Sequence, residues 1–164
     1  MDELLLRQAA AADLEAINAI YNYYVLHCTC TWQTEPETQA DRETWFGRHG
    51  PEHPVIVAES AGEVVGWGSL SAYHGRAGYR HTVKNAVYVR HDALRRGIGS
   101  ALLAVAEAAA REAGAVSIVL DVETDNLSAI RLYQNRGYAA GGATSPLRAE
   151  GHEFSFLRMG KPIR

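Results

Sequence analysis

The chain has 164 residues, of which 47% are hydrophobic and 21% charged, with a formal net charge of −3 at pH 7. This length predicts one domain, residues 1–164, with a composition typical of soluble globular proteins. The slight acidity does not favour a nucleic-acid partner, and no stretch approaches the roughly 20 apolar residues of a membrane span. The acidic start with its short apolar run does not fit a signal peptide.

In the first half of the chain, apolar periodicity predicts three strands and two helices. The strands are expected at 4–9, 54–59 and 64–70, and the helices at about 13–26 and 38–49. Asp13 is expected to cap the first helix. Trp45 and Phe46 are expected on the buried face of the second. The sequence at 60–63 is the strongest hairpin signal of the chain.

The segment 28–36 is β-prone, is polar at alternate positions and is ended by Pro36. It contains Cys28 and Cys30, the two cysteines of the chain. A spacing of two residues is neither a disulfide framework nor a metal-ligand pattern, and buried free cysteines are common. We therefore expect a reduced, cytoplasmic protein without a metal site, and the alternative is a redox role for the pair.

The second half of the chain alternates strands and helices. After a loop at 73–79, strands are expected at 85–89 and 116–122, with a helix at 100–113 between them that ends before Gly114. A second helix begins at Asp125 or Asn126 and ends at Gly137, and two strands follow, the last near 153–159. Without a repeat or linker, this order predicts one α/β domain with a mixed sheet.

The turn at 94–100, Leu-Arg-Arg-Gly-Ile-Gly-Ser, connects an apolar strand to the alanine-rich helix. The first N–H groups of a helix have no internal acceptor and lie at the positive end of the helix dipole. Glycines allow close approach of a phosphate, and arginines add charge. The turn therefore predicts a site for a phosphorylated cofactor, and the alternative is a simple tight connection. Leu102 excludes the Gly-x-Gly-x-x-Gly pattern, and no Gly-Lys-Ser/Thr follows.

Residues 122–138 read Val-Glu-Thr-Asp-Asn-Leu-Ser-Ala-Ile-Arg-Leu-Tyr-Gln-Asn-Arg-Gly-Tyr. They resemble the C-terminal signature of the GNAT superfamily of acyl-CoA-dependent N-acyltransferases: a strand, an Asn, a helix with Ala-Ile-x-Leu-Tyr, and a Gly-aromatic pair. The turn at 94–100 resembles the pyrophosphate turn of that superfamily, Gln/Arg-x-x-Gly-x-Gly/Ala. It departs from the pattern at Leu94 and Arg95. The resemblance covers the whole chain and implies a mostly antiparallel sheet of about seven strands flanked by helices. Its splayed central strands would hold acetyl-CoA.

Four shorter motifs resemble the phosphinothricin and methionine-sulfone acetyltransferase branch of that superfamily. They are Ile-Tyr-Asn-Tyr-Tyr-Val at 20–25, Thr-Glu-Pro at 34–36, Val-Gly-Trp at 65–67 and Tyr-Arg-His-Thr-Val at 79–83. The branch implies acetyl transfer to the amine of a small amino-acid analogue, in a ternary complex, by a homodimer. Acetylation of a protein N-terminus or a polyamine, and a non-catalytic acyl-CoA-binding module, are the alternatives.

The resemblance also implies roles for individual residues. The cofactor contacts would be Val87, Tyr88, Val89, Arg95, Arg96, Gly97, Ile98, Gly99, Ser100, Asn126 and Tyr133. The strand residues would pair with the pantetheine arm, the turn would hold the pyrophosphate, and Asn126 would contact the pantetheine. Tyr133 would protonate the leaving thiolate, because a phenol with a pKa near 10 stays protonated at pH 7. The alternative for Tyr133 is a core aromatic.

The general base of the branch is missing from this chain. A glutamate follows Tyr-Arg-His-Thr-Val in the branch, whereas this chain has Lys84. Glu35 and His81 are the remaining candidates for the base or for substrate contacts, and Tyr79 and Lys84 are candidates for substrate contacts. A structural or solvated role is open for Glu35, His81 and Lys84. Residues 145–152 lack the Gly-Phe-Lys and Trp-rich pattern of the branch, so a herbicide-type acceptor is not expected.

Overall fold

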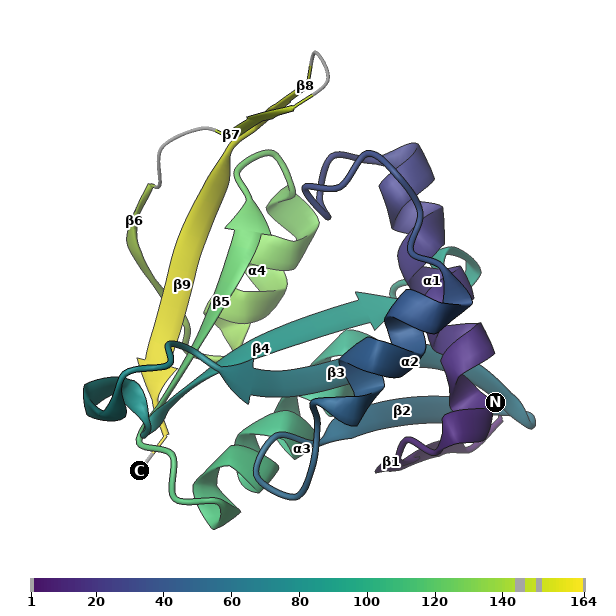
Figure 1. The fold of residues 1–164 in the computed structure, drawn as a ribbon, viewed down its shortest axis with the longest axis horizontal. Helices are drawn as coiled ribbons and strands as arrows, with labels where there is room; N and C mark the ends of the chain where they lie inside the picture. Colours follow the sequence, from purple (N-terminus) through teal and green to yellow (C-terminus); the bar gives the residue numbers. More distant parts are fainter. Residues whose placement is uncertain (1, 144–146, 150–151, 164) are drawn as a thin grey trace.

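The computed structural model of the chain describes residues 2–143, 147–149 and 152–163, and its main element is a seven-stranded sheet (Figure 1). The strand order is β1-β2-β3-β4-β5-β9-β6, and all neighbours are antiparallel except β4 and β5. The strands of this sheet are β1 (Leu4–Gln8), β2 (Val55–Ser60), β3 (Glu63–Ala72), β4 (Thr82–Val89), β5 (Ser117–Glu123), β6 (Ala139–Ala143) and β9 (Phe156–Pro162). A separate pair is formed by β7 (Leu147–Ala149) and β8 (His152–Phe154). The α-helices are α1 (Leu14–His27), α2 (Gln39–Gly47), α3 (Ile98–Glu112) and α4 (Leu127–Asn135).

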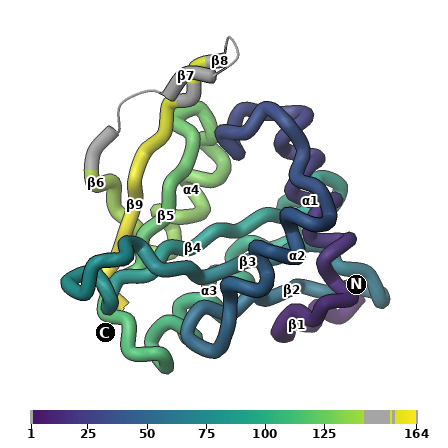
Figure 2. Tube along the Cα trace, viewed as in Figure 1, coloured from purple at the N-terminus to yellow at the C-terminus, as the bar shows by residue number. Residues whose placement is uncertain are grey.

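Alternate side chains of β2 face two helical layers, as the two-residue period of a strand requires. Val55 and Val57 pack in one cluster with apolar residues of α1, whereas Ile56 and Ala58 pack in another with residues of α3. Figure 2 shows the path of the chain from α1 and α2 through β2 and β3. Gly66 allows α3 to approach β3 closely, because a Cβ there would lie 3.1 Å from Ile98 Cγ2.

The central strands β4 and β5 diverge. They pair in parallel only where Thr82, Val83 and Lys84 face Ser117, Ile118 and Val119. On its other side β4 stays paired with β3 as far as Val89, and β5 stays paired with β9 as far as Glu123. The opening between the two arrowheads is visible in Figure 1. Among the residues that the structure describes, the edge of β4 beyond Lys84 therefore has no strand partner on the β5 side.

Several predicted local features are confirmed. The β2–β3 hairpin turns through Ala61 and Gly62, whose φ angles of +51° and +79° match the left-handed conformation that a two-residue hairpin favours. Thr38 caps α2 by accepting from Asp41 N at 3.1 Å. Of the two candidates for the start of α4, Asn126 is the cap, because its Oδ1 accepts from Ala129 N at 3.2 Å.

Asp13 differs from its prediction. It precedes α1 directly, but its carboxylate does not cap the helix. The two oxygens accept from Arg7 at 2.8 and 2.9 Å, and one also accepts from Ala10 N at 2.7 Å. The side chain therefore connects the short 3₁₀ turn Ala11–Asp13 to β1, because a guanidinium offers a stronger partner than a neutral amide.

The segment 28–36 forms turns instead of the strand that its composition favours. A disulfide joins Cys28 and Cys30, whose Cα atoms lie 5.5 Å apart, and both residues are half-buried. The expectation of buried, reduced cysteines is therefore wrong, because the turn after α1 brings the two sulfurs together.

Trp45 and Phe46 lie on the inner face of α2 as expected, because both are half-buried and pack against the core cluster that contains Val57 and Trp67. The fully buried residue of α2 is Arg42, which was not expected. One further expectation needs correction. After Gly137 the described chain forms four strands instead of two, with β9 inserted between β5 and β6. The side chains of residues 145–152, where the pattern of the phosphinothricin branch is missing, lie outside the part of the chain that the structure describes. No helix in the described ranges is long and apolar enough to cross a membrane.

Candidate active site

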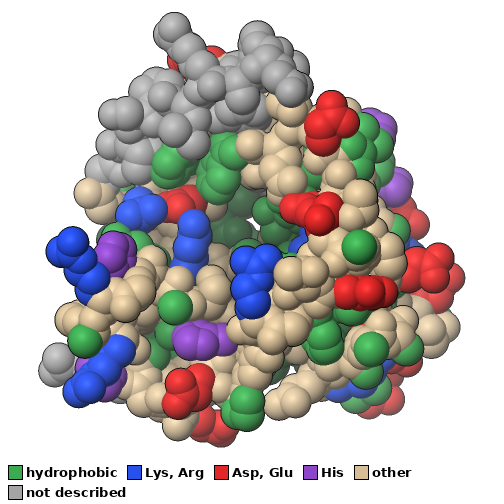
Figure 3. Space-filling model, viewed as in Figure 1, with side chains coloured by type: hydrophobic (Ala, Val, Ile, Leu, Met, Phe, Trp, Pro, Cys, Tyr) green, Lys and Arg blue, Asp and Glu red, His purple; other side chains and the backbone are tan. Residues whose placement is uncertain are grey.

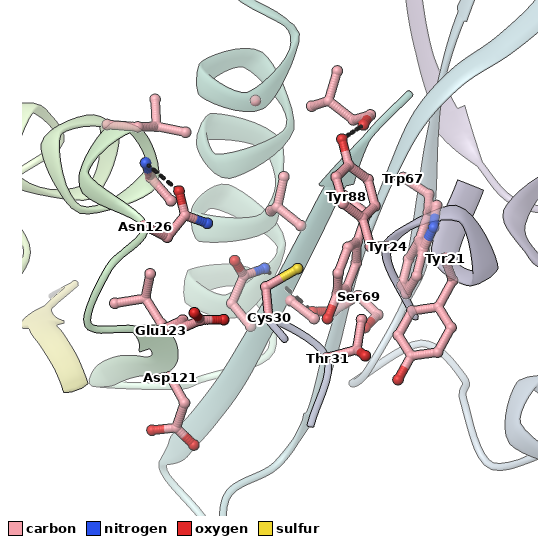
Figure 4. Close-up of a pocket in the computed structure, with 18 of the residues that line it drawn as sticks. Tyr21, Tyr24, Cys30, Thr31, Trp67, Ser69, Tyr88, Asp121, Glu123 and Asn126 are labelled. Atoms are coloured by element: carbon pink, nitrogen blue, oxygen red, sulfur yellow. Dashed lines mark hydrogen bonds between the residues drawn. The ribbon is translucent and has the colours of Figure 1, made fainter. Parts of the chain in front are cut away.

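A cavity of about 760 Å³ lies where β4 and β5 diverge (Figure 4). This volume is typical of small-molecule sites. Its walls come from α1, α2, the loop between them, β3, β4, the turn before α3, β5 and α4. The space-filling view shows a hollow near the middle of this face, with Lys or Arg side chains beside it (Figure 3).

The turn before α3 forms one end of the cavity. Gly97 has a φ of +78° and precedes the first helical residue, and Ala101 N makes the first helical bond to its carbonyl at 3.0 Å. The N–H groups of 98–100 therefore have no acceptor within the helix. A Cβ on Gly99 would lie 3.0 Å from Leu132 Cδ2, so glycine allows α4 to approach this turn. These free donors at a helix start suit the diphosphate of coenzyme A.

The predicted cofactor residues converge on this cavity, with one exception. The lining includes Val87, Tyr88, Val89, Arg95, Gly97, Ile98, Gly99, Ser100, Asn126 and Tyr133. Arg96 does not line the cavity, and its Nη2 donates to Asp92 O at 3.4 Å. The unpaired edge of β4 offers peptide groups to an extended ligand in the way that a sheet edge accepts an added strand.

Tyr133 reaches the cavity from α4 and is 8% exposed. Burial raises the pKa of Tyr133 to about 12. Its ring packs edge-on against Tyr138, with the centroids 5.9 Å apart. The phenol is therefore protonated at neutral pH and can donate a proton or a hydrogen bond into the cavity.

Aromatic rings form a second wall of the cavity: Tyr88 of β4, Tyr21 and Tyr24 of α1, and Trp67 of β3. Tyr88 stacks on Trp67 with centroids 5.0 Å apart, and Tyr21 packs edge-on against Tyr88 at 5.2 Å. Tyr24 donates its hydroxyl proton to the carbonyl of Val89, which ties α1 to the end of β4. Figure 4 shows these rings opposite the acidic residues of β5.

Asp121 forms an ion cluster in the cavity. It accepts from Lys84 Nζ at 3.0 Å and from Arg158 Nε and Nη2 at 2.8 and 3.1 Å. Burial alone would raise the pKa of the Asp121 carboxyl, but the two cations outweigh burial and lower it. Lys84 is therefore the partner of a cavity carboxylate and not a free solvated cation.

Glu123 lies two residues further along β5 and also lines the cavity. Its Oε1 accepts from Thr29 Oγ1 at 2.7 Å. Asp121 and Glu123 are not among the site residues predicted from the sequence. The available signal was their alternation with the buried residues Leu120 and Val122, which places both acids on one face of β5.

Three of the residues predicted for catalysis or acceptor binding also lie outside the cavity lining. His81 is exposed near the paired end of β4, where its Nε2 accepts from Arg80 at 3.0 Å. Glu35 is exposed, and Tyr79 is exposed and packs against Tyr73. In the described part of the chain, no group of three or more His, Cys, Asp and Glu side chains is arranged to hold a metal ion.

Comparison with known proteins gives consistent matches. Residues 17–138 match the family model described as Acetyltransferase (GNAT) family. The L-methionine sulfoximine/L-methionine sulfone acetyltransferase of Pseudomonas aeruginosa is 36% identical over 139 residues, which are 84% of this chain and 81% of that protein. The L-amino acid N-acyltransferase MnaT of Escherichia coli is 34% identical over 134 residues, 81% of this chain and 78% of MnaT.

A solved structure agrees with these sequence matches. The GNAT superfamily phosphinothricin acetyltransferase of Sinorhizobium meliloti, in complex with acetyl-CoA, has a TM-score of 0.89 and 28% identity to this chain. The match covers 97% of this chain and 88% of that structure. Together with the diverging strands and the glycine turn, these matches show that the chain belongs to the GNAT family of acetyltransferases.

Proposed function

We propose that residues 1–164 act as one domain that transfers the acetyl group of acetyl-CoA to the primary amine of a small, amino-acid-like acceptor. The observation that carries this proposal is a single cavity with two chemically different halves. One half has the free edge of β4, the helix-start donors and Tyr133, and the other has charged and aromatic side chains. The relatives named for L-methionine sulfone and for L-amino acids support this acceptor class.

The cofactor half is built from backbone donors. The N–H groups of 98–100 donate to the pyrophosphate, with the charges of Arg95 and Arg96 close in sequence. Peptide groups of Val87 to Val89 pair with the pantetheine amides, and Asn126 contacts the same arm. Acetyl-CoA supplies the thioester carbonyl, and a β4 N–H near Val87 stabilises the charge that develops on its oxygen.

Tyr133 donates a proton to the departing sulfur. Its raised pKa of about 12 keeps the proton on the phenol until the carbon–sulfur bond breaks. The attacking amine forms the new carbon–nitrogen bond in the ternary complex, and the thiol leaves with the proton from Tyr133. The nitrogen then releases its surplus proton as the amide forms, and Tyr133 is reprotonated, so the net reaction conserves protons. Holding the amine and the thioester together provides much of the rate acceleration.

The acceptor ammonium must lose a proton before it attacks, and we assign this proton to Glu123. His81 and Glu35 lie outside the cavity lining, and Asp121 is bound by two cations. Glu123 ends β5 and accepts one hydrogen bond from Thr29. The backbone carbonyl of Glu123 accepts from Asn126 N at 3.0 Å, and both residues line the cavity, so Glu123 is next to the residue assigned to the pantetheine arm.

An acceptor screen tests the proposal. Thiol release from acetyl-CoA is measured with L-methionine sulfone, L-leucine, phosphinothricin, spermidine and a short peptide with a free N-terminus. Release with the free amino acids supports the proposal. Release only with spermidine or only with the peptide favours the corresponding alternative. Tight coenzyme A binding without acceptor-dependent release would instead identify a non-catalytic acyl-CoA-binding module.

Assembly and location are separate proposals. The resemblance to the phosphinothricin branch supports a homodimer, which light scattering on the purified chain would test. A cytoplasmic location is supported by the use of acetyl-CoA and a small amine. The Cys28–Cys30 disulfide makes thiol alkylation in fresh lysate a useful check, because free thiols are expected in a reducing compartment.

A further inference from the structure

Arg42 is a buried cation at the acceptor half of the cavity. It lies on α2, lines the cavity and is 4% exposed. Its Nε donates to Asn18 Oδ1 at 3.1 Å, whereas its Nη2 is buried and has no hydrogen-bond partner among the described residues. A buried guanidinium with an unbonded nitrogen is costly, so its presence needs a physical explanation.

Aromatic rings surround the guanidinium. Its central carbon lies 4.7 Å from the ring centroids of Tyr21 and Trp45 and 5.7 Å from that of Trp67. Cation–π attraction offsets part of the cost of burying the charge. The aromatic rings supply no carboxylate oxygen to the N–H groups of Arg42. The guanidinium can therefore still form a charge-assisted hydrogen bond.

The charge of Arg42 is also less compensated than the charges of Lys84 and Arg158. Lys84 and Arg158 share Asp121, but Arg42 has no carboxylate within salt-bridge distance in the described part of the chain. Glu37 is the acid with the largest electrostatic effect on Arg42, and its own Oε1 accepts from Gln33 at 3.0 Å. The cavity therefore contains a cation that lacks an anion.

The surrounding structure holds Arg42 in place. Asn18 accepts from its Nε and also donates from Nδ2 to the carbonyl of Glu37 at 2.9 Å. Asn22 donates to the same carbonyl at 2.9 Å and accepts from Glu37 N at 2.8 Å. Two side chains of α1 thus fix the segment that leads into α2, which pre-organises the guanidinium for a ligand.

We propose that Arg42 binds the carboxylate of the acceptor, which makes α-amino acids with a free carboxylate the preferred substrates. Guanidinium and carboxylate are matched for charge-assisted hydrogen bonds. The carboxylate of an α-amino acid is one carbon away from the amine-bearing carbon, so anchoring it restricts the position of the attacking nitrogen. This inference rests on the proposed function, because it concerns the acceptor half of the same cavity.

Matched acids and amides test the role of Arg42. Initial rates are measured with L-methionine sulfone and L-leucine and with the primary amide of each, for the wild type, Arg42→Gln and Arg42→Lys. The wild type is expected to show a lower KM for each acid than for its amide. Arg42→Gln is expected to lower kcat/KM for the acids about 100-fold and for the amides less than threefold. Arg42→Lys is expected to restore part of the preference for the acid.

Two experimental results would overturn this inference and leave the proposed function intact. Equal loss for acids and amides in Arg42→Gln would show a purely structural role. Loss of acid preference in Lys84→Met, with the preference kept in Arg42→Gln, would move the carboxylate site to Lys84. If Arg42→Gln does not fold, Arg42→Lys and Lys84→Met decide: a reduced acid preference in Arg42→Lys alone supports the anchor at Arg42, whereas a full preference in Arg42→Lys, or equal KM values for acid and amide in the wild type, contradicts it. Absence of any acceptor-dependent release by the wild type would overturn the proposed function as well.

Discussion

Lys84 Nζ lies 3.0 Å from Asp121 Oδ2, just beyond the last parallel pair of β4 and β5, which joins Lys84 to Val119. The phosphinothricin branch, which the chain resembles, has a glutamate at the position of Lys84. In this chain the carboxylate lies on the neighbouring strand and the cation on β4. An acidic side chain is therefore present in this region, but it is neutralised by Lys84 and Arg158.

This ion cluster predicts unequal effects of removing its members. Asp121→Asn leaves both cations without an anion, and we expect it to lower the free energy of unfolding by about 1–3 kcal/mol. Lys84→Met leaves Asp121 bound to Arg158, so a loss below about 1 kcal/mol is expected. Urea unfolding of both variants measures the difference. A larger loss for Lys84→Met would contradict this description of the cluster.

Gly97→Glu is predicted to abolish acetyl-CoA binding. The substitution places a carboxylate beside the helix-start donors and forces a side chain onto a φ of +78°. Gly97→Asn is the matched control, because Asn tolerates the left-handed region and adds no charge. Calorimetric titration should show at least a 30-fold weaker Kd for the Glu variant and a much smaller change for the Asn variant. Equal affinity of Gly97→Glu and the wild type would exclude this turn from the phosphate site.

Tyr133→Phe is predicted to lower kcat about 100-fold and to change the Kd for acetyl-CoA less than threefold. The reason is that the hydroxyl acts on the departing sulfur and not on the bound ground state. Tyr138→Phe is the matched control, because this neighbouring ring does not line the cavity. Steady-state rates and coenzyme A titrations separate the two effects. A Tyr133→Phe variant with full turnover would rule out the acid role.

Glu123→Gln tests the assignment of the base. The variant keeps the shape of the side chain and an acceptor for Thr29, but it cannot take a proton. We expect kcat/KM at pH 7 to fall at least 30-fold and to recover in part at high pH, where more acceptor is already deprotonated. The pH profile of kcat/KM with L-methionine sulfone is the measurement. A parallel loss at all pH values would indicate that Glu123 only positions the acceptor.

The free energy of unfolding should depend on pH in the acidic range where Asp13 becomes protonated. The hydrogen bonds from Arg7 lower the pKa of Asp13 below its ordinary value of 3.8. A carboxyl with a lowered folded-state pKa stabilises the fold above its unfolded pKa and loses this contribution as the pH falls toward the folded one. The free energy of unfolding should therefore decline below about pH 4, and Asp13→Asn should decline less steeply. Urea unfolding between pH 2.5 and 7 compares the two slopes.

Local patterns in the sequence predict much of this fold because their causes are local. The positive φ angles at Ala61 and Gly62 and the Asn126 cap depend on neighbouring residues, and the structure confirms these features. Asp13 shows where local prediction fails. Its sequence position favours a helix cap, but its carboxylate instead accepts a hydrogen bond from Arg7, which lies on β1.

The acceptor half could not be predicted because its residues depend on distant neighbours. An arginine on a short amphipathic helix normally lies in solvent, and the rings that cover Arg42 come from α1, α2 and β3. Likewise, only the pairing of β4 with β5 brings Lys84 to Asp121. By contrast, the acids of β5 were detectable from their alternation with buried residues.

The divergence of β4 and β5 has a consequence for solubility. A strand edge with unpaired peptide groups at the rim of a sheet can template aggregation with another molecule. In this chain the free edge of β4 lies in the middle of the sheet, between β3 on one side and the departing β5 on the other. A second protein strand would need to enter between two parts of one domain to reach it. The fold thus exposes peptide groups to a slender ligand while shielding them from neighbouring proteins.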